Sequence, residues 1–253
     1  MDSFAALFDL SDRVAVVTGA TRGLGYAIAH GLARAGAGVV VASRKKDACI
    51  EAADRIRAET GRPTLAYPIN VGHWHELDGL IDATYDRFGH LDVLVNNAGM
   101  SPRYDSIDTV SEALFDKIMA VNLKGPFRLS AIAGSRMATD RGGSIVNISS
   151  TVSSRPRPEL VPYALAKAGL NNLTLGLAQT FGPTVRCNAI VCGTFLTDIS
   201  KHWDQEAFAA RARQFALGRG GHPDEVVGTA LYLASAASSF TTGALLTVDG
   251  GQP

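Results

Sequence analysis

Residues 14–36 read VAVVTGATRGLGYAIAHGLARAG. A short β-branched run is followed at once by a turn that contains three glycines, and then by apolar residues at helical spacing. In a strand–turn–helix unit such glycines let backbone N–H groups approach a pyrophosphate, and the positive end of the helix dipole faces it. The turn therefore predicts a dinucleotide-binding site. The residues expected to form it are Gly19, Thr21, Arg22, Gly23, Leu24 and Gly25.

The same alternation of short β-branched runs and longer amphipathic stretches continues along the whole chain, which is typical of βαβ units around a parallel sheet. Strands are predicted at Val14–Thr18, Gly38–Ser43, Thr64–Ile69, Leu91–Val95, Gly143–Ile148, Val185–Ile190 and Ala244–Val248. Helices are predicted near 24–36, 46–60, 74–88, 111–139, 162–181 and 224–236. Because no linker or repeat interrupts this pattern, residues 1–253 are expected to form a single α/β domain, a doubly wound sheet of about seven parallel strands with helices on both faces.

Composition excludes several classes of protein. The chain has 24 Lys and Arg against 24 Asp and Glu, so it lacks the basic surface that nucleic acids or anionic membranes attract. No apolar run approaches the roughly 18 residues of a membrane span, and the first residues lack the basic start of a secretory signal, so a cytoplasmic location is expected. Cys49, Cys187 and Cys192 lack metal-ligand spacing and are expected to be free, buried thiols. His73 and His75 have no third ligand nearby, so no metal site is predicted.

The end of the second predicted strand bears on the choice of cofactor. NAD-binding sites usually carry an Asp or Glu there, which holds the ribose hydroxyls. Here the strand ends in Ser43, Arg44 and Lys45, and a guanidinium at this position can grip a 2′-phosphate that a carboxylate would repel. With Arg22 close by in the glycine turn, NADP(H) is the expected cofactor. NAD(H) stays open as the alternative, in which Arg44 and Lys45 are simply solvated.

A tyrosine and a lysine four residues apart, Tyr163 and Lys167 in YALAK, lie on one face of a predicted helix. A nearby ammonium favours a phenolate and lowers the tyrosine pKa, so the pair is a plausible acid/base unit. Taken alone, the pair is also a common feature of amphipathic helices. Its meaning depends on the motifs that accompany it.

Five motifs stand in order along the chain: TGATRGLG, NNAG at 96–99, VNLKG around Asn122, GSIVNISS ending at Ser150, and YALAK. In this order the sequence resembles the short-chain dehydrogenase/reductase family, including its 3-oxoacyl-carrier-protein reductase-like members. The resemblance extends from DLSDRVAVVTG to LTVDGG. The 13-residue interval between Ser150 and Tyr163 matches the serine and tyrosine of the family. The resemblance implies a Rossmann-type fold, an NAD(P)-dependent oxidoreductase that interconverts a carbonyl and a secondary alcohol, and a homotetramer.

The resemblance also implies roles for four catalytic residues. Tyr163 would give a proton to the substrate oxygen in reduction and remove it in oxidation, while Ser150 would hydrogen-bond the same oxygen. Lys167 would lower the tyrosine pKa and hold the nicotinamide ribose. Asn122 would anchor a water that connects the lysine to solvent. A non-catalytic nucleotide sensor of the same fold is the third alternative, and the intact set of four argues against it.

Further cofactor contacts follow from the same resemblance, with two departures from the family pattern. Cys192-Gly193 stands where a Pro-Gly pair is usual, and Asn70 replaces the usual acid ahead of Val71. Cys192 lacks the ring by which a proline would fix φ at this position. Asn70 still has a side chain that can donate or accept a hydrogen bond. The additional residues expected at the cofactor are Ser43, Arg44, Asn70, Val71, Asn97, Ala98, Gly99, Tyr163, Lys167, Gly193 and Thr197.

Two segments are candidates for contact with the substrate. The stretch 195–215, which contains Trp203, Phe208 and Phe215 among polar residues, predicts an amphipathic lid within residues 194–220. The segment SSRPRP at 153–158 offers Arg155 or Arg157 to an acidic substrate group, although a solvated loop is the favoured interpretation. The identity of the substrate does not follow from the sequence, because one fold hosts many chemistries.

Overall fold

One sheet organises the molecule, and its strands all run parallel in the order β3-β2-β1-β4-β5-β6-β7. The computed structural model describes residues 4–198, 200 and 204–253. The strands are β1 (Val14–Thr18), β2 (Gly38–Ser43), β3 (Thr64–Pro68), β4 (Val93–Asn96), β5 (Gly143–Ser150), β6 (Val185–Cys192) and β7 (Leu245–Val248). The predicted strands are therefore all present, with ends that differ by at most two residues.

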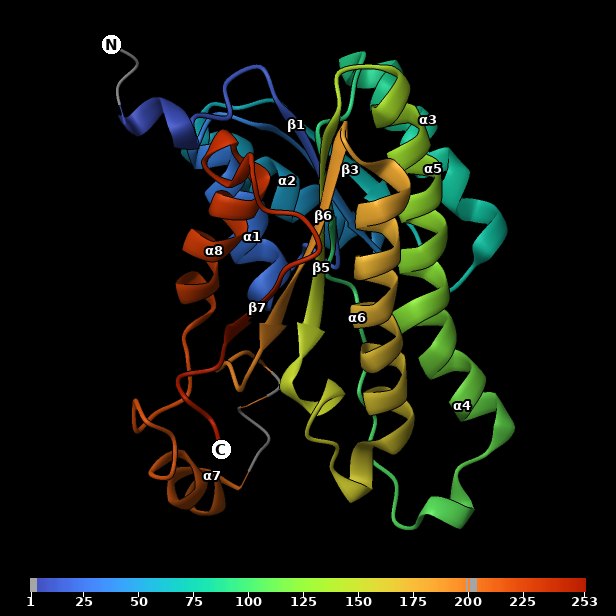
Figure 1. Ribbon diagram of the computed structural model, residues 1–253, viewed down its shortest axis with the longest axis vertical. Helices are drawn as coiled ribbons and strands as arrows, with labels where there is room; N and C mark the ends of the chain where they lie inside the picture. Colours follow the sequence, from blue (N-terminus) through green and yellow to red (C-terminus); the bar gives the residue numbers. More distant parts are fainter. Residues whose placement is uncertain (1–3, 199, 201–203) are drawn as a thin grey trace.

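Helices cover both faces of the sheet, as Figure 1 shows. One layer contains α1 (Gly23–Arg34), α2 (Lys46–Thr60) and α8 (Val227–Ala234). The other contains α3 (Leu77–Phe88), α5 (Gly125–Thr139) and α6 (Val161–Phe181), with α4 (Glu112–Met119) leading into α5. A short helix, α7 (Gln205–Ala212), lies apart from both layers near the C-terminal end. The described residues contain no helix long and apolar enough to cross a membrane.

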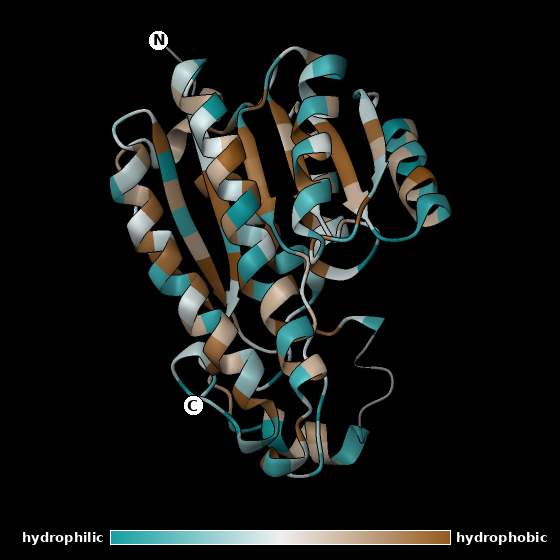
Figure 2. Ribbon diagram, turned by 90° about the vertical axis from the view of Figure 1, so that its right-hand side faces the viewer, coloured by the Kyte–Doolittle hydropathy of each residue, from teal (hydrophilic) through white to brown (hydrophobic). Residues whose placement is uncertain are grey.

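Burial on both faces explains the near-continuous apolar strands. Every residue of β1 is buried, because alternate side chains enter the two separate cores on either side of the sheet. Val17 packs with the α1 and α2 layer, whereas Val16 packs with the α3 and α5 layer. The strands are accordingly the most hydrophobic part of the ribbon in Figure 2, while the helices mix hydrophilic and hydrophobic residues along their length.

The strand order reverses direction between β1 and β4. β1 pairs with β2 on one side and with β4 on the other, so the helices that follow these strands leave toward opposite faces. Such a switch point leaves a crevice at the carboxyl ends of the strands, where doubly wound folds bind their ligands. The glycine-rich turn after β1 and the loop after β4 meet at this crevice.

The prediction of a single helix at 111–139 is wrong in the middle of that range. α4 and α5 are separated by a π turn at Ala120–Lys124, where the Gly125 N–H donates to the Ala120 carbonyl. The side-chain Nδ2 of Asn122 donates a hydrogen bond to the Ile118 carbonyl at 2.9 Å. Pro126 has no N–H that could donate to the Asn122 carbonyl, as the residue four positions on would in a regular helix. Both residues therefore favour the irregular turn over a continuous α-helix. Two other predicted helices begin late, because 3₁₀ turns occupy Trp74–Glu76 and Pro223–Val226.

Candidate active site

The glycine-rich turn is held in place by a side chain from the neighbouring strand. Asn97, just after β4, donates from Nδ2 to the Thr18 carbonyl at 2.8 Å and to the Gly19 carbonyl at 3.3 Å. A Cβ on Gly25 would stand 2.3 Å from both this Nδ2 and the Gly19 oxygen, so only glycine fits. Gly19 itself has φ of 65°, in the left-handed region that favours glycine. Gly19 and Gly25, the first and third glycines of the turn, thus serve its own packing as well as any ligand.

The N-terminus of α1 opens onto the cleft without a side-chain cap. Arg22 occupies the N-cap position in an extended conformation, and its side chain accepts no backbone hydrogen bond. The first N–H groups of the helix, at Gly23, Leu24 and Gly25, therefore have no side-chain cap, and all three residues line the cleft. An uncapped helix N-terminus of this kind suits a pyrophosphate, so the turn fits the dinucleotide that the sequence predicts.

The adenosine end of the cleft carries the two arginines on which the cofactor prediction depends. Arg22 and Arg44 are exposed and line the same cleft, where Thr21 and Ser43 approach each other at 3.4 Å between their hydroxyl oxygens. Within the described residues neither arginine forms an ion pair. Two unpaired guanidinium groups beside an uncapped helix fit a cofactor with an additional phosphate.

Asn70, which replaces an expected acid, shapes the turn after β3. Its Oδ1 accepts from the Gly72 N–H at 3.1 Å, and its Nδ2 lies 3.0 Å from Nε2 of His73. The other ring nitrogen of His73 lies 3.0 Å from Glu76. The described residues contain no group of three or more potential ligands that could hold a metal ion. His73 is therefore engaged by its neighbours on the chain.

The catalytic candidates meet where β5 ends and α6 begins. Ser150 is the last residue of β5, Tyr163 lies in the first turn of α6, and Lys167 lies one turn further on the same face. The Lys167 Nζ donates to the carbonyl of Ile148 at 2.7 Å and lies 5.7 Å from the centroid of the Tyr163 ring. Lys167 is buried, whereas part of Tyr163 is open to the cleft. The structure therefore brings a hydroxyl, a phenol and an ammonium to one point.

Burial dominates the electrostatics of this group. It raises the pKa of Tyr163 to about 12, against a smaller lowering by the Ser150 hydroxyl. It also lowers the pKa of Lys167 to about 8. The expected lowering of the tyrosine pKa is therefore not met in the free protein, where the ammonium is directed to the Ile148 carbonyl and burial of the phenol raises the pKa.

Asn122 lies behind this group rather than in the cleft. It is fully buried in the π turn, where Nδ2 donates to the carbonyls of Ile118 and Met100, each at 2.9 Å. Its Oδ1 accepts from the Met100 N–H at 3.1 Å. Because both amide hydrogens are already used, the side chain has no donor left for a water. The groups of Asn122 left to accept a hydrogen bond from a water are Oδ1, which has a second lone pair, and the backbone carbonyl, to which Pro126 cannot donate.

Cys192 takes the place of the expected proline at the end of β6. Its thiol is buried, and burial raises its pKa to about 12, although Lys167 acts to lower it. The next residue, Gly193, donates its N–H to Val248 at 3.0 Å, and a Cβ on it would lie 2.5 Å from Cβ of Asp249. Close contact of Gly193 with the segment after β7 thus fixes this turn, although Cys192 lacks the ring by which a proline would restrict φ. All three cysteines are buried and free, as expected.

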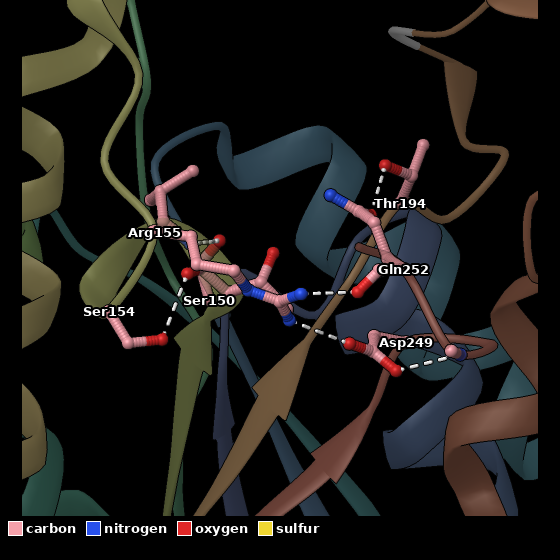
Figure 3. Close-up of polar contacts among 9 residues, drawn as sticks. Ser150, Ser154, Arg155, Thr194, Asp249 and Gln252 are labelled. Carbon is pink, nitrogen blue, oxygen red and sulfur yellow. Dashed lines mark hydrogen bonds and ion pairs between the residues drawn. The ribbon is translucent and has the colours of Figure 1, made fainter. Parts of the chain in front are cut away.

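Arg155 belongs to a network that ties the loop after β5 to the last residues of the chain (Figure 3). Its Nη2 pairs with Asp249 at 3.0 Å, and its Nη1 donates to the Gln252 carbonyl. The Gln252 side chain accepts from the Thr194 hydroxyl at 3.0 Å. Of the two arginines considered for an acidic substrate, Arg155 is thus occupied by this network. Arg157 lines the cleft.

The predicted lid contains α7 and the segments around it. Phe195 forms a bridge with Gly221, and both Phe195 and Phe215 are buried, so these two rings anchor the segment. Phe208, on α7, lines the cleft. Trp203, also assigned to the lid, lies outside the described residues.

A single open cleft of about 1490 Å³ connects these parts. Every residue predicted for the site lines it except Asn122. Sequence reasoning assigned no individual role to several lining residues, two of them within the predicted lid, because they belong to no recurring motif and reach the cleft through loop and lid geometry. Those with chemistry to offer are Arg103, Thr194, Arg211 and Gln252.

Comparisons with known proteins agree with this geometry. The model of a family described as enoyl-(acyl carrier protein) reductase matches residues 19–252. The chain is 33% identical to 5-keto-D-gluconate 5-reductase of Escherichia coli over 248 residues, which cover 97% of each protein. It is 36% identical to a short chain dehydrogenase/reductase of Aspergillus oryzae over 250 residues, 96% of each.

A solved structure agrees over the whole fold. The gluconate 5-dehydrogenase of Burkholderia cenocepacia, in complex with NADP and tartrate, superposes with a TM-score of 0.93 at 34% identity, covering 99% of this chain and 98% of that one. The protein is thus an NAD(P)-dependent oxidoreductase, and the expectation of a nicotinamide dinucleotide is confirmed. Within that class, the chain belongs to the short-chain dehydrogenase/reductase family.

Proposed function

We propose that the protein uses NADP(H) to interconvert a carbonyl and a secondary alcohol, with Tyr163 as the general acid and base. One observation carries the proposal: the Tyr163 phenol lines the cleft and is hydrogen-bonded to Ser150, and the buried Lys167 Nζ lies 5.7 Å from the centroid of its ring. The same cleft reaches the uncapped N-terminus of α1, so that both ends of a dinucleotide have a place. A nucleotide sensor would need only the second of these features.

In reduction, the Tyr163 hydroxyl donates its proton to the substrate oxygen, and in oxidation it removes that proton. The bound nicotinamide supplies or accepts the hydride. Ser150 donates a hydrogen bond to the same oxygen and holds it at the phenol. A phenol whose pKa is about 12 is a reluctant acid, so the step needs a nearby positive charge that favours the phenolate.

Lys167 supplies that charge from the next turn of α6. Its pKa of about 8 leaves the ammonium largely protonated at neutral pH, yet close to the value at which it can release a proton. Proton exchange with solvent then passes behind Gly99, where Asn122 and Lys167 approach each other: a Cβ on Gly99 would lie 2.9 Å from the Asn122 Oδ1 and 3.8 Å from Nζ. In this proposal the backbone carbonyl of Asn122 binds the intervening water.

Arg44 and Arg22 support NADP(H) over NAD(H). Both are exposed at the cleft beside the end of β2, and no carboxylate stands at Ser43 to repel a 2′-phosphate. The cofactor residues assigned from the sequence, Thr197 and Val71 among them, line the cleft that these arginines enter.

The assembly that we propose is a homotetramer, with the lid at 194–220 closing over each site. Apolar side chains stand exposed on α4, α5 and α6, and on β7. They are Phe115, Phe127, Leu165, Leu175 and Leu245. Exposed apolar side chains grouped on long helices suit subunit contacts. The cytoplasmic location expected from the sequence stays a prediction.

The test is Tyr163→Phe, which keeps the ring and its packing and removes the proton donor. Turnover of a panel of ketones with NADPH should fall by roughly 10²–10⁴-fold. Binding of NADPH, followed by its fluorescence, should change little. Tyr232→Phe is the matched control, because it removes a phenol that is hydrogen-bonded to Thr241 at 2.7 Å, away from the cleft. Turnover in Tyr163→Phe equal to that of the control would remove Tyr163 from the mechanism.

A further inference from the structure

Three arginines from separate parts of the chain line the cleft that contains Ser150 and Tyr163. Arg103 follows β4, Arg157 lies between β5 and α6, and Arg211 belongs to α7 in the lid. They are distant in sequence and reach one cavity only in the folded chain.

These arginines lie close enough to affect one another. The pKa of Arg211 is lowered first by burial and then by the charges of Arg157 and Arg103, whereas Glu159 acts in the opposite direction with a smaller effect. At Arg211 the repulsion from each of these two arginines therefore outweighs the attraction of Glu159. Repulsion among these arginines raises the free energy of the unliganded protein. An anion that binds between them offsets this repulsion.

The acids along the cleft leave these charges in place. Asp204 accepts the N–H groups of Glu206 and Ala207 and so serves as the N-cap of α7. Within the described residues, Arg103 and Arg157 form no ion pair. The cluster therefore presents positive charge to the cavity.

Arg211 is held in position before any ligand arrives. Its Nη2 donates to the Thr194 hydroxyl at 2.5 Å, two residues beyond Cys192 at the end of β6. Its guanidinium lies 5.5 Å from the ring centroid of Phe215 and 6.0 Å from that of Phe208. Thr194 is in turn fixed by Gln252, as Figure 3 shows. A planar fork that is fixed in this way is suited to bind a carboxylate.

We propose that the substrate is a keto acid, or the corresponding hydroxy acid, whose carboxylate binds Arg211 with support from Arg157 and Arg103. The carbonyl of the same molecule then lies at Ser150 and Tyr163. The inference rests on the proposed function and narrows it, because it specifies a negatively charged substrate and assigns Arg211 of the lid to bind its carboxylate.

The experiment measures NADPH-dependent reduction of a series of keto acids of increasing length, each paired with its methyl ester. For at least one pair the acid should have the higher kcat/KM, by roughly 10- to 100-fold, which corresponds to one or two charge-assisted hydrogen bonds. Arg211→Gln should remove this advantage, mainly by raising KM for the acid, and should leave the ester and NADPH binding nearly unchanged. Arg211→Lys should restore part of it. Arg213→Gln is the matched control, because Arg213 is exposed at the end of α7 and does not line the cleft.

Equal kcat/KM for acids and esters in the wild type would overturn the inference and leave the proposed function intact. An equal loss for acid and ester in Arg211→Gln would also overturn it, since the residue would then be structural. Arg157→Gln provides a second measurement, with a smaller loss expected for the acid alone. If neither acids nor esters are reduced by a protein that binds NADPH, both the inference and the proposed function fail.

Discussion

The buried ammonium of Lys167 should make the free protein less stable at neutral pH than it would be without that charge. Its pKa in the folded chain is about 8, against the ordinary value of 10.5, because burial disfavours the charged form. Below pH 8 both states are protonated, and the folded state carries the full cost of the buried charge. Between pH 8 and 10.5 the folded state loses the proton first, so the cost falls as pH rises.

The magnitude follows from the two pKa values. Each pH unit between them is worth about 1.4 kcal/mol, so the cost is about 3 kcal/mol at pH 7 and falls below about 1 kcal/mol at pH 10. Cys187, Cys192 and Tyr163 act in the opposite sense at high pH. Their pKa values are raised to about 12, so the unfolded chain ionises first and stability falls. Wild-type data alone would mix these contributions.

A comparison with Lys167→Met isolates the lysine. Urea unfolding at one protein concentration and at pH 7, 8, 9 and 10 gives the difference in unfolding free energy between the variant and the wild type. This difference should be larger at pH 7 than at pH 10 by about 2.5 kcal/mol. The Ile148 carbonyl loses its donor in the variant at every pH, so that loss shifts the curve without changing its slope. A difference that stays constant from pH 7 to 10 would refute the reasoning. Lys46→Met, at the exposed start of α2, is the control. An equal change with pH in its unfolding free-energy difference would show that the effect comes from removing any lysine charge and not from the burial of Lys167.

Two further predictions concern the cofactor and the assembly. Arg44→Ala should weaken NADP(H) binding by roughly 10-fold, the value of one partly exposed charge-assisted contact, and change NAD(H) binding little; equal losses in the two titrations would mean that the 2′-phosphate is not read here. Light scattering at working concentration should give about four times the 26.6 kDa of one chain, and a fully active monomer would contradict the proposed tetramer.

The strands and the cofactor turn follow from the sequence because local and tertiary preferences agree there. In β1 a β-branched run is buried on both faces, and the three glycines that follow it are required by the turn itself. The sequence thus predicted the topology that places the site. The helix prediction failed within 111–139. The apolar periodicity continues through the π turn, but there the side-chain Nδ2 of Asn122 donates to the Ile118 carbonyl, which a regular helix would use for a backbone hydrogen bond. Pro126 was the available signal for that interruption.

The parts of the site that the sequence could not predict depend on distant contacts. Arg155 and Arg157 look alike in SSRPRP, yet one pairs with Asp249 and the other lines the cleft. The pKa of Tyr163 depends on burial, which residue spacing does not reveal, so charge proximity alone predicted the wrong direction for the free protein. Arg211 belongs to a lid whose sequence has no motif, and its place depends on Thr194.

The π turn at Ala120–Lys124 bears on how this chain tolerates insertions and deletions. The ring closed by the Gly125-to-Ala120 hydrogen bond holds one residue more than an α turn, so the π turn accommodates one extra residue while the helices on either side keep their rotational phase. Removing one residue here would therefore allow α4 and α5 to join as one regular helix, with Leu129 and Met137 still facing the sheet. The Asn122 side chain, which lies with Lys167 behind Gly99, would lose its place in the turn. A shortened chain should therefore keep its helical content by circular dichroism and its core packing, and lose the arrangement behind the site.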